Sequence, residues 1–513
     1  MLDQLLKKSW MPFSIRVVGV ILFLLLMFLL FIGTIEVFSI KLSSKLAMFL
    51  IWILWWPLLY ITLIFVGRLW CGFICPLGLA NEAGNYVRKG RTINLIRWGF
   101  IPFVIFFLVV YLEQISGLFV SANITLAFIT AFFMAAFIFG ILFSRSLFCM
   151  IICPIGTIIR VFSRLSLLGV RPDPKVCAKC KTFDCIKGRV ASKCPMFINI
   201  PKNKSNALCL MCTNCIKNCP HGSAKLRFVK PGKEILDKVK FVTSESIFII
   251  ALLALTTLLT TNGNLIYRTI VPTPFTGALL RLIDFSAAIS IFIASYLLIT
   301  YLTTLISKQD FRTAVKEYGY VYLPMAFFIM FFTITFDFLG PSLNMTELAK
   351  ASIKYVLLTI GMLWSIFILF KFTIKFTKKL SSGILHLFFI VGLGLAWLTL
   401  LIPGPLNLYP ELGGTVIVNP GDAVEITSYS MGYDPSTIIV QKGVQVTMKI
   451  TNKDVTHAID INEFNVHKVL KGGRMTTVNF VPDKTGEFKL YCSIPGHEEA
   501  GMKAKLIVKD KID

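Results

Sequence analysis

Nine long runs of apolar residues limit what this chain can fold into more strongly than any other feature of its sequence. Each run is long enough to cross a hydrocarbon layer of about 30 Å as a helix. Each is also apolar on all sides, without the alternation of a half-buried strand. The runs cover residues 15–39, 46–67, 98–119, 124–144, 245–265, 277–305, 321–340, 351–374 and 383–402. The sequence therefore predicts a multi-pass α-helical membrane protein.

The composition agrees with this class and excludes others. Of the 513 residues, 56% are hydrophobic and 15% are charged, which is wrong for a soluble enzyme. The net charge is +25, but no basic domain or motif for nucleic acid is present, so we expect no nucleic-acid partner. Most of the excess Lys and Arg falls in alternate loops. This pattern predicts an N-terminus inside a prokaryotic cytoplasmic membrane and a C-terminus outside it.

Two stretches outside the apolar runs have a different composition. Residues 171–240 form a basic, cysteine-rich loop, which the charge pattern places in the cytoplasm. Residues 412–513 contain short β-branched runs broken by "KGG" and "DKTG", which favours an all-β domain. The predicted organisation is membrane helices in 1–170, the loop in 171–240, membrane helices in 241–403, a linker in 404–411 and the β-domain in 412–513.

The cysteines of the loop have the spacing of iron–sulfur ligands. The stretch "CLMCTNCIKNCP" at 209–220 has the pattern C-x2-C-x2-C-x3-C-P, in which the fourth cysteine ligates the other cluster of a two-cluster ferredoxin. A structural zinc site is the alternative, but the complete pattern favours two [4Fe-4S] clusters. The first cluster would be held by Cys177, Cys180, Cys185 and Cys219, and the second by Cys194, Cys209, Cys212 and Cys215.

A second cysteine motif is repeated 78 residues apart, in "RLWCGFICPLG" and "RSLFCMIICPIG". Each C-x3-C-P copy places two thiols on one helical face. If the two copies pack side by side, the four thiols of Cys71, Cys75, Cys149 and Cys153 converge near the inner surface. Three interpretations stay open, namely a third metal or cluster site, a thiol relay, or packing and turn formation around Cys-Pro.

The C-terminal region contains the ligand set of a blue-copper site. The stretch "DVTHAIDI" supplies His457, and "YCSIPGHEEAGM" supplies Cys492, His497 and Met502. Two imidazoles, one thiolate and a weak axial thioether are the donors of a mononuclear type 1 copper centre. A β-domain that has lost its metal is the alternative, and His467 is expected to be a surface residue rather than a ligand.

These motifs carry two resemblances to known families. Residues 1–240 resemble the membrane polyferredoxins NapH, NosR and CcoG, which pair two C-x3-C-P hairpins with a cytoplasmic two-cluster ferredoxin loop. The tail resembles cupredoxins, and its ligand loop is most similar to that of rusticyanin. The tail is also similar to the copper domain of cytochrome oxidase subunit II. The binuclear site of that domain needs a second cysteine where this chain has Gly496.

The resemblances imply a membrane electron-transfer protein in a respiratory chain. Electrons would reach copper from the clusters or from the quinone pool, and redox partner proteins would bind on both sides. The alternative is a copper-handling or maturation factor, either a cupric reductase like CcoG or a copper carrier. In the membrane part, charges near the outer helix ends mark a candidate quinone or proton site. Helix-end pairing would explain these charges equally well, and they belong to Arg281, Asp284 and Asp337.

Overall fold

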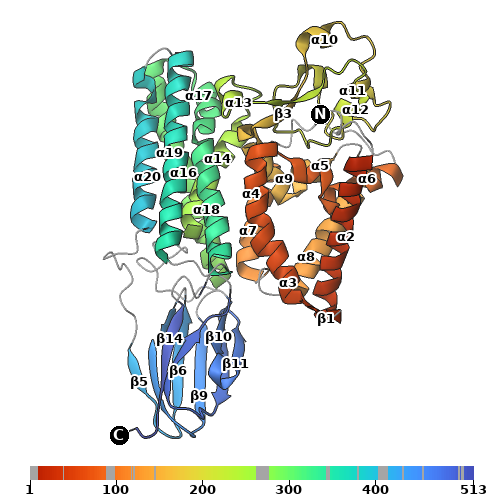
Figure 1. Cartoon of the computed structure of the whole chain (residues 1–513). Coiled ribbons are helices and arrows are strands. Elements are labelled where there is room, and N and C mark those ends of the chain that lie inside the picture. Colours follow the sequence, from red (N-terminus) through yellow and green to blue (C-terminus); the bar gives the residue numbers. More distant parts are fainter. Residues whose placement is uncertain are drawn as a thin grey trace.

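The computed structural model describes residues 10–37, 40–87, 99–116, 118, 122–143, 146–260, 277–342, 347–377, 380–401, 414–429, 432–452, 456–494, 497 and 502–512. Two groups of helices lie side by side (Figure 1). The cysteine-rich loop lies at one end of these helices and a β-sandwich at the other.

The first group of helices contains both C-x3-C-P motifs. Its elements are α2 (Trp10–Ile32), α3 (Ser44–Met48), η1 (Phe49–Leu54), α4 (Trp55–Val66), α5 (Leu69–Phe73), α6 (Pro76–Val87), α7 (Ile101–Ser116), α8 (Ala122–Leu142), η3 (Phe148–Ile152), α9 (Pro154–Phe162) and η4 (Ser163–Leu165). One predicted boundary is wrong. The first run was expected to be helical to residue 39, but α2 ends before Gly33, whose φ of 87° stops a helix. A hairpin of β1 (Thr34–Val37) and β2 (Ile40–Ser43) follows.

The second group of helices follows the cysteine-rich loop. Its elements are α14 (Thr243–Thr260), α16 (Gly277–Ser307), α17 (Phe311–Tyr318), η6 (Gly319–Tyr322), α18 (Leu323–Ser342), α19 (Glu347–Phe372), η7 (Thr373–Thr377), η8 (Leu380–Gly383) and α20 (Ile384–Leu401).

The predicted helical membrane class is confirmed. Every predicted run coincides with a helix over most of its length. Among the described residues, six helices are long and apolar enough to cross a membrane: Ser14–Ile32, Leu46–Val66, Ala122–Leu142, Phe285–Ser307, Ser352–Thr377 and Ser381–Leu398. Ile101–Glu113 and Thr243–Leu258 are shorter apolar helices.

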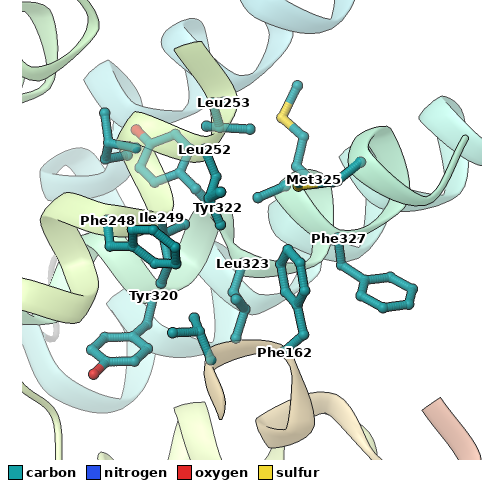
Figure 2. Packing of buried hydrophobic residues seen from close by; sticks show 14 of the residues in the cluster. Phe162, Phe248, Ile249, Leu252, Leu253, Tyr320, Tyr322, Leu323, Met325 and Phe327 are labelled. Atoms are coloured by element: carbon teal, nitrogen blue, oxygen red, sulfur yellow. The ribbon is translucent and has the colours of Figure 1, made fainter. Parts of the chain in front are cut away.

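A shared apolar core joins the two groups of helices (Figure 2). Phe162 of α9 meets Phe327 of α18 edge to face, with ring centroids 5.2 Å apart. Phe103 of α7 stacks on Phe248 of α14 at 4.3 Å. Aromatic contacts of this kind add to the free energy gained by burying the rings. The segment that follows the second C-x3-C-P motif is therefore anchored to the second helical group.

The cysteine-rich loop folds around a two-stranded antiparallel ribbon. Strand β3 (Leu168–Arg171) pairs with β4 (Lys225–Phe228), so the two ends of the loop lie together. Between and after these strands are α10 (Pro174–Ala178), α11 (Asp184–Lys187), η5 (Ile200–Lys202), α12 (Asn214–Asn218) and α13 (Lys233–Leu236).

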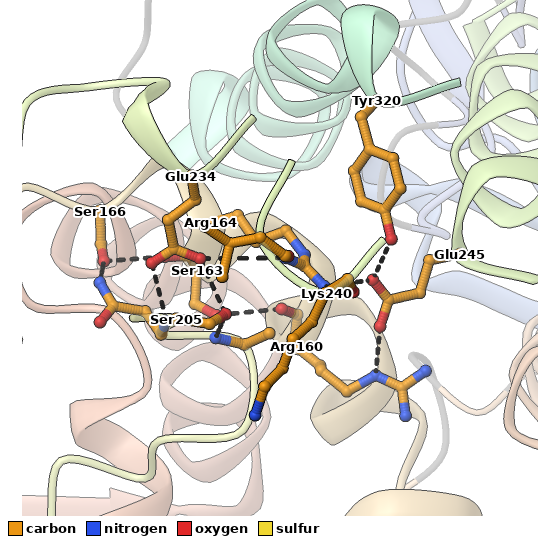
Figure 3. A network of polar contacts seen from close by, with 12 residues as sticks. Arg160, Ser163, Arg164, Ser166, Ser205, Glu234, Lys240, Glu245 and Tyr320 are labelled. Carbon is orange, nitrogen blue, oxygen red and sulfur yellow. Dashed lines mark hydrogen bonds and ion pairs between the residues drawn. The ribbon is translucent and has the colours of Figure 1, made fainter. Parts of the chain in front are cut away.

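Buried ion pairs fix this loop against the helices (Figure 3). Arg164 of η4 donates to Glu245 of α14 at 2.8 Å and lies 3.9 Å from Glu234 of α13. The hydroxyl of Tyr320 donates to Glu245 at 2.6 Å, and Arg171 donates to Glu234 at 2.7 Å. Buried charges are tolerated when they are paired and hydrogen-bonded. The network therefore specifies how the loop docks.

The C-terminal region is an all-β sandwich, as predicted. One sheet has the order β11-β10-β13-β14-β8-β5 and the other has β12-β9-β6-β7. Inward side chains such as Met448, Ile450 and Leu506 are fully buried and form the core. The strands are β5 (Thr415–Ile417), β6 (Ala423–Tyr429), β7 (Gly432–Asp434), β8 (Thr437–Gln441), β9 (Val446–Asn452), β10 (His457–Ile461), β11 (Val466–Leu470), β12 (Met475–Phe480), β13 (Gly486–Tyr491) and β14 (Lys503–Lys509).

Candidate metal centres

Three neighbouring strand ends position the four predicted copper ligands. His457 opens β10, Cys492 directly follows β13, and Met502 directly precedes β14. His497 lies in the connection between β13 and β14. The backbone N–H of Cys492 donates to the carbonyl of Met502 at 3.1 Å, and the N–H of Met502 donates to the carbonyl of His497 at 2.9 Å. These bonds close the loop, so the strand pairing determines where its donors lie.

The donor atoms of the copper site converge on one point. Nδ1 of His457 lies 3.0 Å from Nδ1 of His497, which lies 3.5 Å from Sγ of Cys492. His457, Cys492 and His497 form a group whose donor atoms all lie within 4.8 Å of one another. Within the described part of the chain, no other group of three or more His, Cys, Asp or Glu side chains does so. Cys492 and Met502 are fully buried. Two imidazoles and a thiol at this spacing fit a mononuclear copper ion.

The surroundings of Cys492 hold its sulfur in place. The N–H of Ala458 donates to Sγ at 3.2 Å. Burial raises the pKa of the thiol to about 11, and hydrogen bonds from the backbone of Ala458 and Ile494 act in the opposite direction. The neighbouring Asp460 accepts a hydrogen bond from the N–H of Ser493 at 3.2 Å and pairs with Nδ1 of His467 at 2.8 Å. His467 is therefore a partner of Asp460 at the surface.

The first predicted iron–sulfur quartet is brought together by the loop. The pKa of the Cys185 thiol is raised to about 11 by burial and then by three nearby thiols, which belong to Cys219, Cys177 and Cys180. These are the partners that the crossed ferredoxin pattern predicts. Ser223 lies beside two of them, because its N–H donates to Sγ of Cys219 at 3.2 Å and its hydroxyl lies 3.1 Å from Sγ of Cys177.

The second quartet lines a cavity of its own. Positive φ angles at Met211 (58°) and Thr213 (62°) turn the chain tightly between its ligands. Burial raises the pKa of the Cys212 thiol to about 12, with a further contribution from Cys194. The cavity is bounded by Cys194, Cys209, Cys212 and Cys215. Four thiols around one cavity fit a cubane cluster, whose ligands stand farther apart than those of a single ion.

The two C-x3-C-P motifs also meet. Burial raises the pKa of the Cys75 thiol to about 12, and the thiols of Cys71 and Cys153 raise it further. The pKa of Cys149 is raised by burial and then by Cys153, Cys71 and Cys75. The four thiols therefore lie close enough to influence one another, as expected if the repeated hairpins pack side by side.

Sequence reasoning missed one buried cation beside these thiols. Arg68, three residues before Cys71, is 1% exposed. Its Nη1 donates to the carbonyl of Ala207 at 3.0 Å, whereas its Nε and Nη2 have no hydrogen-bond partner among the described residues. The signal was present in the sequence, because both repeats begin with arginine in "RLWCG" and "RSLFC".

The candidate quinone or proton site is not described by the structure. Arg281 lies in α16 with Asp284, and Asp337 lies in α18, but all three side chains fall outside the described ones. A cavity of about 440 Å³ lies elsewhere, at the junction of the cysteine-rich loop and the helices. Residues that border it include Met150, Arg160, Leu208 and Glu245.

Comparisons with known proteins identify two families in different parts of the chain. Residues 48–94 and 126–171 match the family model of a 4Fe-4S binding domain, and these segments include both C-x3-C-P motifs. Residues 395–508 match that of a cupredoxin-like domain. The chain therefore combines a 4Fe-4S binding domain with a C-terminal cupredoxin-like domain.

Three relatives illustrate the two parts. An uncharacterised protein of Methanocaldococcus jannaschii is 27% identical over 169 residues, or 31% of this chain and 63% of that protein. Cytochrome c oxidase subunit 2 of Thermus thermophilus is 29% identical over 91 residues, or 17% of this chain and 65% of that protein. Nitrous-oxide reductase of Cupriavidus necator is 32% identical over 91 residues, or 17% of this chain and 14% of that protein. The chain thus spans less than two thirds of each of these relatives.

Proposed function

We propose that this chain is a membrane-bound electron-transfer protein that links [4Fe-4S] clusters on the cytoplasmic side to a type 1 copper centre outside, in a respiratory chain. The observation that carries this proposal is the combination, in one polypeptide, of two cysteine quartets and a convergent His457–Cys492–His497 site at opposite ends of apolar helices (Figure 1). Clusters and type 1 copper both supply one-electron chemistry.

The Lys and Arg pattern supports the orientation. Basic residues around the cysteine-rich loop favour the cytoplasmic side of a membrane. The relatives of the copper domain support the respiratory role, because two of them are named cytochrome c oxidase subunit 2 and nitrous-oxide reductase. Donors and acceptors are expected to be separate redox proteins on each side.

The protein's contribution at copper is to hold its ligands rigidly and to exclude water. Met502 and Cys492 are tied together by a backbone hydrogen bond, and both side chains are fully buried. The N–H of Ala458 points at Sγ of Cys492, where it stabilises negative charge on sulfur. A site whose donors move little between oxidation states favours fast electron transfer.

The quinone pool is a second source of electrons, and the 440 Å³ cavity supports it. Its volume lies within the range of roughly 300–1,000 Å³ typical of ligand sites. Met150 and Leu208 border it, and each is adjacent in sequence to a cysteine of a thiol quartet. Arg160 borders this cavity and would donate hydrogen bonds to a quinone oxygen.

Spectroscopy on the purified full-length chain separates this function from copper delivery. An electron-transfer protein retains its copper through repeated reduction and oxidation, with an intense blue absorption that bleaches and returns. A copper carrier would instead release cuprous ion to an external cuprous chelator after each reduction. Loss of copper in step with reduction would overturn the proposal in favour of a copper-handling factor.

A further inference from the structure

The C-x3-C-P thiols adjoin the second ferredoxin quartet. One cavity is lined by Cys71, Cys75 and Cys149 and also by Cys212. Contact between the two regions is at the level of the backbone, because a Cβ built on Gly72 would lie 2.2 Å from the carbonyl oxygen of Leu210 and 3.0 Å from the backbone nitrogen of Cys212. Only glycine fits at this position. Groups bound at the two quartets would therefore be close neighbours.

The two repeats present their thiols in the same way. In the first, a Cβ on Gly78 would lie 3.0 Å from the carbonyl oxygen of Cys71, and in the second, a Cβ on Gly156 would lie 2.4 Å from that of Cys149. Each repeat thus reads C-x3-C-P-x-G, with the glycine closing a tight turn over the first cysteine. Such a duplicated turn supplies two thiols from each half, which makes the tetrathiolate donor set of a cubane cluster.

Two arginines border this set of thiols, and one of them is already neutralised. The Nη2 of Arg16 donates to the carbonyl of Gly72 at 3.0 Å, its Nη1 pairs with Glu82 at 3.1 Å, and both residues line the shared cavity. Arg68 is deeply buried, lies three residues before Cys71, and donates from Nη1 to the carbonyl of Ala207, two residues before Cys209, at 3.0 Å. Its Nε and Nη2 lack partners among the described residues. A buried guanidinium is costly unless negative charge accompanies it.

We infer that Cys71, Cys75, Cys149 and Cys153 hold a third iron–sulfur cluster, which exchanges electrons with the cluster at Cys212, and that Arg68 lies between the two as their shared counter-cation. Four thiolates outweigh the positive charge of a cluster core, so a cluster on each side supplies the anions that Arg68 requires. The exchange is a one-electron step. One cluster is oxidised as the other is reduced, and no bond is formed or broken.

The role of Arg68 is one of positioning and tuning. A buried positive charge stabilises the more negative, reduced form of a nearby cluster, so it raises the reduction potential. This inference rests on the proposed electron-transfer function, since it extends the path from the ferredoxin loop toward the membrane helices.

Iron content of the anaerobically purified full-length chain tests the site. We expect about 12 irons per chain, and about 8 in Cys153→Ser, with the ferredoxin signals in electron paramagnetic resonance and the blue copper absorption retained. About 8 irons in the unaltered chain, or a Cys153→Ser variant with the same iron content as the unaltered chain, would overturn the inference while leaving the proposed function intact. The proposed function itself fails if the ferredoxin signals are missing from the unaltered chain.

A second pair of variants tests Arg68 without removing a ligand. Arg68→Gln should keep the iron content but lower the potential of the third cluster in a redox titration, and Arg68→Lys should restore most of the shift. Magnetic coupling between the third cluster and the Cys212 cluster should broaden their signals when both are reduced. Unchanged potentials in Arg68→Gln, or reduced clusters without mutual broadening, would contradict the assignment.

Discussion

The Nδ1 atoms of His457 and His497 lie 3.0 Å apart, although 40 positions separate the two residues in the chain. One residue opens β10, and the other lies in the loop before β14. Strand pairing alone therefore brings two imidazole nitrogens and the sulfur of Cys492 to one point. A site formed in this way needs little rearrangement to bind copper.

Substitution of the predicted axial ligand should change the reduction potential of the copper without abolishing its blue absorption. Met502→Leu conserves volume at a fully buried position, so we expect a loss of less than about 1.5 kcal/mol in stability. The blue absorption should remain, because Cys492 and both histidines are intact, and the reduction potential should change because the axial thioether tunes it. Cys492→Ser is the matched control and should lose the blue absorption entirely. Blue absorption in that control would exclude Cys492 as a ligand.

Copper loading of the metal-free protein should depend on pH. Burial raises the pKa of the Cys492 thiol to about 11, so the thiol is protonated at neutral pH and releases its proton when copper binds. Affinity should therefore rise about tenfold per pH unit from near neutrality up to that pKa. Competition with a chromophoric copper chelator at several pH values measures this slope. An affinity that does not vary with pH would mean that no thiol proton is displaced.

Removal of Arg164 should weaken the joint between the cysteine-rich loop and the helices. Its side chain is 2% exposed and forms ion pairs with both Glu234 and Glu245 (Figure 3). Arg164→Met therefore removes one cationic partner from each of two buried carboxylates. Breaking a buried pair of this kind costs about 3–5 kcal/mol. Thermal unfolding in detergent, followed by loss of the iron–sulfur absorption, measures the effect.

The control for Arg164 is an exposed ion pair in the same loop. Arg227 lies 3.9 Å from Asp173, and both side chains are more than a third exposed. Arg227→Met should change stability by less than about 1 kcal/mol, since exposed pairs contribute little. Equal effects of the two substitutions would show that the buried network does not hold the loop.

The close packing of α6 on α8 should be sensitive to a side chain added at the contact between the two helices. A Cβ added at Gly140 would lie 2.2 Å from the carbonyl oxygen of Asn81, in the helix that follows the first C-x3-C-P motif. Gly140→Ala must therefore separate the helices, and we expect a loss of about 1–3 kcal/mol together with reduced iron content. Gly392→Ala in α20 is the matched control, because a Cβ there meets no atom within 4 Å. A Gly140→Ala protein as stable as this control would contradict the packing.

Sequence patterns predicted which side chains lie together better than they predicted the surroundings of these side chains. Spacing alone grouped Cys185 with Cys219, and His457 with Cys492 and His497, because metals and clusters impose fixed donor numbers and distances. That these residues bind clusters and copper stays a prediction. Hydropathy located the helices but extended the first by several residues, since apolar β-branched residues after Gly33 suit either a helix or a strand.

The sequence did not indicate which of the charged residues are buried. Arg160 and Arg164 follow the fourth predicted run, where a charge count takes them for solvated residues, yet both are ion-paired with Glu245 in the interior. A charge count does not distinguish a solvated arginine from one whose partner is some 80 residues away. A charge count likewise did not show that Arg68 is buried close to the C-x3-C-P thiols.

Electron flow from the clusters to copper can be measured in reconstituted vesicles. The protein is oriented with the cysteine-rich loop facing an added, membrane-impermeant reduced flavodoxin, and the blue absorption of the copper on the far side is followed. We expect the blue absorption to bleach, and to remain in a Cys215→Ser variant that lacks the second ferredoxin cluster. Copper that remains oxidised while the clusters are fully reduced would exclude electron transfer from the clusters to copper.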